Sequence, residues 1–252
     1  MTENFPYKIE NQKLFKEHLN LIKSKLIDYT PILPACTDYY AVLVEFRDLP
    51  ETITIVKEHM YFLNETNSPI KWGLQIFHCE HNEKQIKESL KDIKNIDFIN
   101  LQPKNITNRK ENTEILKTVD FWEKVRGEKI LMFQTDSLLL RSGVDEFLKY
   151  DYIGAPWSKP KEGQIVGNGG LSLRTKQKMI EICIKHKDYD ETLEDIYFNK
   201  HLNGVGVADI ETAKKFSMED IYSPNPLGIH NPIKIETKLL KNVFENSLQN
   251  IV

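Results

Sequence analysis

One carboxylate follows directly on a short apolar run in the middle of the chain. Residues 130–133 are Ile-Leu-Met-Phe, and Gln134, Thr135 and Asp136 come next. A short apolar run predicts a strand buried on both faces, and an open α/β sheet places its ligand site at the carboxyl ends of such strands. Asp136 could therefore hold a divalent cation through oxygen, or it could simply stabilise the following turn.

The neighbours of Asp136 limit what this segment can bind. Side chains alternate along an extended segment, so we expect Gln134 and Asp136 to face one side and Thr135 the other. One carboxylate and one neutral amide make a weak cation site, and the diphosphate of a nucleotide could supply the missing oxygen ligands. We therefore expect little metal binding without nucleotide.

A glycine-rich stretch, Gly167-Asn168-Gly169-Gly170, precedes the strand-like residues 171–173. Glycine in such a stretch indicates a bulge or the close approach of a ligand to the backbone. The alternative is a hairpin turn of the Asn-Gly type. A phosphate-binding P-loop is excluded because no Gly-Lys-Ser/Thr sequence follows.

Each of the other polar residues has more than one reading. Adjacent Glu194 and Asp195 start an expected helix, where they either complement the helix dipole or supply a general base; they diverge by about 100°, so only one can face a given site. His230 lies among turn-forming residues and could be a cation ligand, a base or an exposed loop residue. Glu45 and Arg47 share one strand face, and either form a surface ion pair or contact a base or phosphate.

The surrounding pattern predicts alternating strands and helices. The expected strands are residues 39–46, 73–77, 98–101 and 130–133, and the expected helices are residues 50–63, 83–91 and 112–125. Three βα repeats predict a parallel sheet with right-handed crossovers, as in nucleotide-binding proteins. The second half is richer in Gly and Pro, with helices expected at residues 176–186 and 193–202, and loop-rich halves usually carry specificity.

Composition narrows the class of protein. The chain has 252 residues, a net charge of −3 and no polybasic segment, which argues against a nucleic-acid partner. It holds no apolar run of about 18 residues, and its amino terminus lacks the pattern of a secretion signal. Its three cysteines are far apart without a CxxC motif, which fits a reducing compartment. We expect a cytoplasmic protein without a membrane span.

Taken in order, these motifs resemble those of an uncharacterised domain family allied to the GT-A glycosyltransferases. The motifs are FQTD (133–136), DYIGAPW (151–157), GNGGLSLR (167–174), LEDIYF (193–198) and GIH (228–230). The resemblance spans residues 39–231. It implies an α/β GT-A fold: a Rossmann-like, mostly parallel sheet with flanking helices and an irregular acceptor-side half. We expect this domain over residues 38–252, after an N-terminal helical appendage over residues 1–37.

The resemblance also implies roles for individual residues. Asp136 matches the last carboxylate of the Asp-x-Asp motif, which holds a divalent metal, usually Mn²⁺ (or Mg²⁺), on the donor's diphosphate; Gln134 replaces the first. His230 matches the late histidine that completes the metal shell. Asp195, next to Glu194, matches the catalytic acidic pair, in which Asp is commonly the base of inverting members. The residues expected to bind the donor are Glu45, Arg47, Gln134, Thr135, Asp136, Asn168, Gly169 and Gly170.

These roles predict a hexosyltransferase-like glycosyltransferase that moves a sugar from a nucleotide-diphosphate donor, with UDP-sugar favoured, to the hydroxyl of a glycan or other acceptor. The prediction requires Asp136 and His230 to meet around one ion, and the expected outcome is inverting. The alternative is a non-catalytic nucleotide-sugar or glycan binding module with the same fold, which Gln134 favours. A nucleotide pyrophosphohydrolase ranks last because it needs several carboxylates on two metals.

The amino-terminal region leaves one question of assembly open. Apolar residues between positions 11 and 29 follow a loose helical pattern, which Pro31 and Pro34 end. This helix either mediates a homodimer or covers one side of the sheet, and we favour the second interpretation.

Overall fold

The computed structural model describes residues 5–65, 68–101, 109–186 and 192–251. A six-stranded sheet, sheet A, forms its centre in the order β3-β2-β1-β4-β9-β6. The strands are β1 (Tyr39–Val44), β2 (Gly73–His78), β3 (Ile96–Asn100), β4 (Lys129–Phe133), β6 (Tyr152–Gly154) and β9 (Leu171–Thr175). Strands β1 to β4 pair in parallel, and β9 is antiparallel to β4 and β6. The predicted α/β class with a mostly parallel sheet is confirmed.

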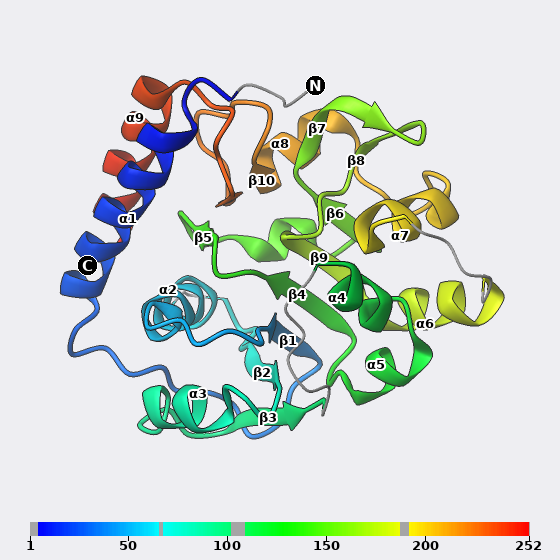
Figure 1. Ribbon diagram of the computed structural model, residues 1–252, viewed down its shortest axis with the longest axis horizontal. Coiled ribbons are helices and arrows are strands. Elements are labelled where there is room, and N and C mark those ends of the chain that lie inside the picture. Colours follow the sequence, from blue (N-terminus) through cyan, green and yellow to red (C-terminus); the bar gives the residue numbers. More distant parts are fainter. Residues whose placement is uncertain (1–4, 66–67, 102–108, 187–191, 252) are drawn as a thin grey trace.

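Helices cover both faces of sheet A (Figure 1). Helices α2 (Thr52–Asn64) and α3 (Glu83–Ser89) pack on one face, and α4 (Arg109–Leu116), α5 (Val119–Lys124), α6 (Lys176–Lys185) and α7 (Glu194–Leu202) lie on the other. Alternate residues of β1 serve the two faces: Ala41 and Leu43 join the core under α2, whereas Tyr40 and Val42 join the core under α5 and α6. A strand buried on both faces explains why the apolar runs identify it.

The prediction of one continuous helix over residues 112–125 is wrong, because the chain forms two helices there, α4 and α5. Thr118 separates them in an extended conformation, and its side chain accepts a hydrogen bond of 3.2 Å from the backbone N–H of Phe121. A threonine that caps a helix in this way starts a new helix at the following residue. The break leaves α4 free to approach the carboxyl end of the sheet.

A second, smaller sheet continues from the end of β4. Sheet B has the order β10-β11-β5, with β10 (Ser217–Met218) parallel to β11 (Gly228–His230) and β11 antiparallel to β5 (Ser137–Leu139). Strands β7 (Pro156–Lys161) and β8 (Gln164–Val166) form a separate antiparallel hairpin, and α8 (Ile210–Phe216) leads into β10. Residues 134–136 therefore join the two sheets.

The amino-terminal helix packs against the carboxyl-terminal one. Helix α1 (Lys8–Lys25) lies beside α9 (Thr237–Ser247) and also contacts α2 (Figure 1). The ring of His18 stacks on Phe244 at 4.1 Å, and Asn11 Nδ2 donates to the carbonyl oxygens of Pro232 and Ile235 at 2.8 and 2.7 Å. Helix α1 therefore covers other helices. The division at residue 37 and a homodimer stay predictions.

The described helices contain no segment with the length and apolarity needed to cross a bilayer.

Candidate functional site

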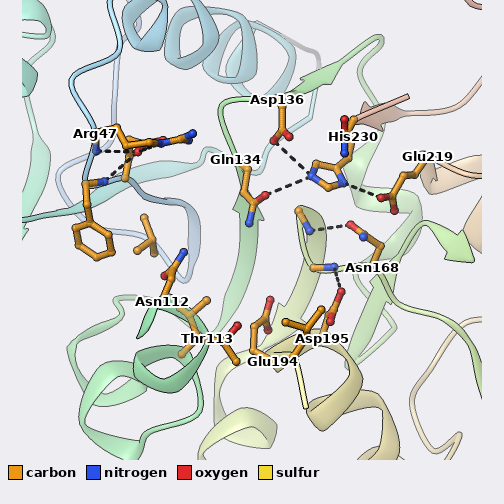
Figure 2. Close-up of a pocket in the computed structure, with 18 of the residues that line it drawn as sticks. Arg47, Asn112, Thr113, Gln134, Asp136, Asn168, Glu194, Asp195, Glu219 and His230 are labelled. Atoms are coloured by element: carbon orange, nitrogen blue, oxygen red, sulfur yellow. Dashed lines mark hydrogen bonds and ion pairs between the residues drawn. The ribbon is translucent and has the colours of Figure 1, made fainter. Parts of the chain in front are cut away.

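A cavity of about 500 Å³ lies beyond the carboxyl ends of β1 and β4, where the sequence predicts a ligand site. Figure 2 shows polar side chains at two ends of it. The end we call the Asp136 end holds Gln134, Asp136, His230 and Glu219. The end we call the Asp195 end holds Glu194 and Asp195, with Asn168 between the two ends. Other polar lining residues are Arg47, Asn112, Thr113 and Lys161.

Sheet B brings His230 to Asp136. In the antiparallel pairing of β11 with β5, His230 lies opposite Ser137, and the N–H of Asn231 donates to the carbonyl oxygen of Asp136 at 2.9 Å. As a result His230 Nε2 lies 3.4 Å from Asp136 Oδ1 and 3.3 Å from Gln134 Oε1. Residues almost a hundred positions apart thus meet as the sequence interpretation requires.

The ionisation of this pair follows from its contacts. Burial opposes ionisation of Asp136, but the hydrogen bond and charge of His230, helped by Arg47, lower the pKa of the Asp136 carboxyl below its ordinary value. Protein surrounds this carboxyl in the cavity, yet 53% of its side-chain area stays open to solvent. Burial alone would lower the pKa of His230, but Asp136 and Glu219 raise it to about 10.

The same atoms fit part of a divalent-cation shell. Neighbouring ligands of an octahedral ion with bonds of about 2.1 Å lie about 3 Å apart, close to the spacings among Gln134 Oε1, Asp136 Oδ1 and His230 Nε2. The described residues contain no group of three or more His, Cys, Asp and Glu that could hold a metal. The set therefore fits a cation whose remaining ligands come from a diphosphate, provided that His230 loses its Nε2 proton.

Thr135 faces away from the cavity, as the alternation predicts, so the expectation that it binds the donor is not supported by its position. Its hydroxyl donates to Glu45 Oε2 at 3.2 Å and accepts from Arg47 Nη2 at 3.1 Å, while Gln134 and Asp136 line the cavity. Thr135 therefore fixes the end of β1 against the end of β4.

Glu45 and Arg47 form the ion pair that one reading expects, and contact of Arg47 with a base or phosphate stays a prediction. Glu45 Oε1 accepts from the backbone N–H and the Nε of Arg47 at 2.9 and 2.8 Å, and Oε2 accepts from Arg47 Nη2 at 2.7 Å. The Glu45 side chain is only 5% exposed, and that of Arg47 is 65% exposed at the cavity wall. Glu45 thus holds a guanidinium whose remaining donors are available to a ligand.

The glycine-rich stretch lies where other segments of the chain, those of His230 and Glu194, come close to its backbone. A side chain at Gly170 would place its Cβ 2.1 Å from His230 Nε2, and one at Gly169 would place it 2.3 Å from Glu194 Oε1. Asn168 orders the stretch, because its Oδ1 accepts from the N–H of Gly170 at 2.8 Å. The hairpin alternative is wrong: β8 and β9 on either side belong to different sheets.

Glu194 is held by a buried arginine that the motif search overlooked. Arg174 Nη1 and Nη2 donate to the two oxygens of Glu194 at 2.7 and 3.1 Å. The guanidinium is fully buried, stacks over the Tyr152 ring at 4.8 Å and also donates to Ser172 Oγ at 2.9 Å. The pair anchors the first turn of α7 to β9.

Asp195 is the member of the acidic pair without a cationic hydrogen-bond partner in the described structure. Its Oδ1 and Oδ2 accept from the backbone N–H groups of Ile196 and Gly169 at 2.9 and 3.3 Å. Burial, reinforced by the negative charge of Glu194, raises the pKa of the Asp195 carboxyl, and Lys161 partly offsets the rise. A buried carboxylate with a raised pKa is suited to accept a proton.

Sequence reasoning missed Arg174, Glu219, Lys161, Asn112 and Thr113. The sequence carried no signal for Arg174: it alternates with Leu171 and Leu173, a pattern that places it with Ser172 on the polar face of a strand, whereas the structure buries it. The others become neighbours of the site only through pairing between distant segments.

Fold and cavity together define a GT-A-like α/β protein. The galactosyltransferase LgtC in complex with donor and acceptor sugar analogs superposes with a TM-score of 0.52 and 12% identity, covering 82% of this chain and 95% of that one. An active-site mutant of LgtC gives 0.51 and 14%, covering 76% and 86%. The inositol-1-phosphate CTP transferase from T. maritima gives 0.50 and 12%, covering 88% and 100%. At these identities the likeness shows the fold.

Residues 95–230, more than half of the chain, match the family described as a protein of unknown function, DUF5672, and the chain belongs to that family. The matched segment contains Asp136, Asn168, Asp195 and His230. No curated protein matches the chain.

Proposed function

We propose that this chain is a glycosyltransferase that moves a sugar from a nucleotide-diphosphate donor, with UDP-sugar favoured, to an acceptor hydroxyl with the help of a divalent cation. One observation carries the proposal. The Asp136–His230 pair, suited to a cation, and Asp195, suited to accept a proton, line a single cavity at the carboxyl edge of a GT-A-like sheet.

The Asp136 end binds the donor's diphosphate in this proposal. Asp136 and His230, with Gln134, would hold Mn²⁺ or Mg²⁺, which supplies positive charge to the diphosphate as it departs. Arg47 adds a guanidinium that Glu45 already orients, so little side-chain freedom is lost when it binds a phosphate oxygen. The nucleoside then lies toward the end of β1 and helix α4, where Asn112 and Thr113 line the cavity.

The Asp195 end binds the acceptor. The acceptor oxygen attacks the anomeric carbon of the donor sugar, the bond from that carbon to the diphosphate oxygen breaks, and the acceptor proton passes to Asp195. Attack from the side opposite the leaving group inverts the anomeric configuration. Gly169 and Gly170 lie between the two ends without side chains, which lets a sugar ring approach the backbone.

Glu194 has a positioning role in this scheme. Both of its oxygens bind Arg174, so they do not reach an acceptor while that pair is intact. The pair instead fixes the start of α7, from which Asp195 projects.

A donor screen tests the proposal directly. The protein is incubated with UDP-, GDP- and CDP-linked sugars and Mn²⁺, with a mixture of simple glycosides as acceptors, and nucleotide release is measured together with the mass of the glycosides. We expect one donor to be turned over with a matching gain of one sugar on an acceptor. Folded protein that turns over no donor contradicts the proposal.

Gln134 supports a second function, a non-catalytic module that binds nucleotide sugar or glycan. Its neutral amide leaves the Asp136 end with one carboxylate besides Glu219 in the described structure. Calorimetry separates the two functions: donor binding that is equally tight in EDTA and in Mn²⁺, without turnover, favours the binding module.

A further inference from the structure

Sheet B aligns three ionisable side chains across three adjacent strands. In the parallel pairing of β10 with β11, Met218 lies opposite Ile229, so the next residues, Glu219 and His230, are also neighbours. On the other side of β11, His230 lies beside the start of β5, directly after Asp136. Figure 2 shows the result, in which the imidazole of His230 stands between two carboxylates.

The two ring nitrogens of His230 have different surroundings. Nε2 faces the cavity, where Gln134 Oε1 and Asp136 Oδ1 lie at 3.3 and 3.4 Å. Nδ1 is on the opposite side of the ring, 3.6 Å from Oε1 of Glu219, which also lines the cavity. Nδ1 has no hydrogen-bond partner in the described structure, and neither has Glu219 Oε2. A movement of a few tenths of an ångström would convert the ion pair into a hydrogen bond.

Glu219 differs from the acidic residue next to it. Asp220 Oδ2 accepts from Ser158 Oγ at 3.0 Å and from Lys234 Nζ at 2.8 Å, contacts that tie the β7–β8 hairpin to the segment after β10. Glu219 is 86% buried by its side-chain area, with 14% exposed, and its charge has no cationic partner besides His230 in the described residues. A carboxylate with so little exposure loses hydration free energy, which an ion pair or hydrogen bond with a partner must offset.

We propose that Glu219 is a positioning residue for His230: it accepts the Nδ1–H of the imidazole, so that the Nε2 lone pair faces the cation site. This inference rests on the proposed function. A carboxylate behind a histidine ligand fixes the tautomer and ring orientation and raises the basicity of the coordinating nitrogen. Loss of such a partner typically weakens metal binding by about 10- to 100-fold.

Cation binding tests the inference without any turnover assay. The variants are Glu219→Ala, which removes the acceptor, and Glu219→Gln, which keeps an oxygen acceptor without the charge. Glu211→Gln is the matched control, because its side chain is 79% exposed on α8 and pairs with Lys214. The probe is Mn²⁺ titrated by calorimetry into protein saturated in turn with UDP, GDP or CDP, after a thermal melt has verified folding.

We expect Glu219→Ala to weaken Mn²⁺ binding by about 10- to 100-fold, Glu219→Gln to weaken it less, and the control to match the unchanged protein. A second readout is the ring ¹⁵N spectrum of His230, recorded above its pKa of about 10 so that the ring is neutral. Nδ1 then carries the single ring proton in the unchanged protein and loses this preference in Glu219→Ala. If both Glu219 variants bind Mn²⁺ as tightly as the unchanged protein and show the same ring signals, the inference is overturned. The proposed function stays intact in that case.

Failure of the proposed function gives a different pattern. The unchanged protein would then bind no Mn²⁺ with any of the three nucleotides. The ring spectra of the metal-free protein, recorded with the ring neutral, still decide the tautomer of His230: a change in Glu219→Ala supports Glu219 as its partner, and identical spectra overturn it. If Glu219→Ala does not fold, Glu219→Gln provides both readouts.

Discussion

Asp136 and Asp195 are chemically identical side chains at two ends of one cavity, and their surroundings shift the pKa values of their carboxyl groups in opposite directions. Asp136 faces a protonated imidazole and an arginine, which lower its pKa and keep it ionised. Asp195 is buried beside the negative Glu194, which raises its pKa. A separation of this kind between two carboxyl groups usually marks division of labour: one stays charged to hold a cation, and the other exchanges a proton.

The largest expected effect comes from exchanging each aspartate for asparagine. Asp195→Asn removes the proposed base and should lower turnover by roughly 10³-fold, while Mn²⁺–nucleotide binding stays unchanged. Asp136→Asn removes a charged ligand and should impair both turnover and binding. Steady-state kinetics and calorimetry on the same preparations separate the two patterns.

Asp120→Asn is the control for the aspartate exchange, because this residue of α5 is 81% exposed and its carboxylate pairs with Lys124 on the surface. It should behave as the unchanged protein. Loss of Mn²⁺–nucleotide binding in Asp195→Asn would show that the two ends are not separate in function.

Stability should expose the buried support of the Asp195 end. Arg174→Leu leaves the Glu194 carboxylate buried without its partner and should lower the free energy of unfolding by about 3–5 kcal/mol. The double variant Arg174→Leu/Glu194→Leu removes both charges and should recover much of that loss. Urea unfolding followed by tryptophan fluorescence measures both values.

The double variant also bears on function. It should fold but turn over donor more slowly than the unchanged protein, because the start of α7 has lost its anchor. If Arg174→Leu alone lowers the free energy of unfolding by less than about 1 kcal/mol, the ion pair does not hold α7 in place.

Adjacent glycines allow the two ends to be disturbed separately. Gly170→Ala would press a methyl group against His230 Nε2 and should weaken Mn²⁺–nucleotide binding by about tenfold or more. Gly169→Ala would press against Glu194 Oε1 and should slow turnover with little change in binding. Each should lower stability by about 1–3 kcal/mol through overpacking, so thermal melts accompany the assays.

The paired design supplies its own control, since the two substitutions are identical and one residue apart. Equal losses of Mn²⁺–nucleotide binding in both variants would contradict the assignment of Gly170 to the Asp136 end and Gly169 to the Asp195 end.

The first half of the fold follows from local patterns. Strands β1 and β4 are buried on both faces, so continuous apolar runs mark them. The second half does not follow in this way. Strand β10 has two residues and β11 has three, too few for any periodicity, and they exist because Met218 pairs with Ile229 across the loop between them.

The site divides along the same line. Asp136, Asp195 and His230 could be predicted because short motifs carry them. Their partners could not, because Glu219 reaches His230 through strand register and Arg174 reaches Glu194 from β9 to α7. The expectation from helix geometry that only one of Glu194 and Asp195 faces the site is wrong, because both line the cavity. Only the position of Arg174 indicates which carboxylate is already bound.

The smallest expected effect is a change in the pH profile at the Asp195 end. A base must be deprotonated to act, so kcat/KM should rise with pH through the pKa of Asp195, which lies above the ordinary value for an aspartate. The cation of Lys161 lowers that pKa. Lys161→Gln should therefore shift the rising limb to higher pH, whereas Lys159→Gln, an exposed residue outside the cavity lining, should leave it in place. Equal shifts in both variants would reflect general surface charge, and an unchanged limb in Lys161→Gln would mean that a group other than Asp195 controls the proton.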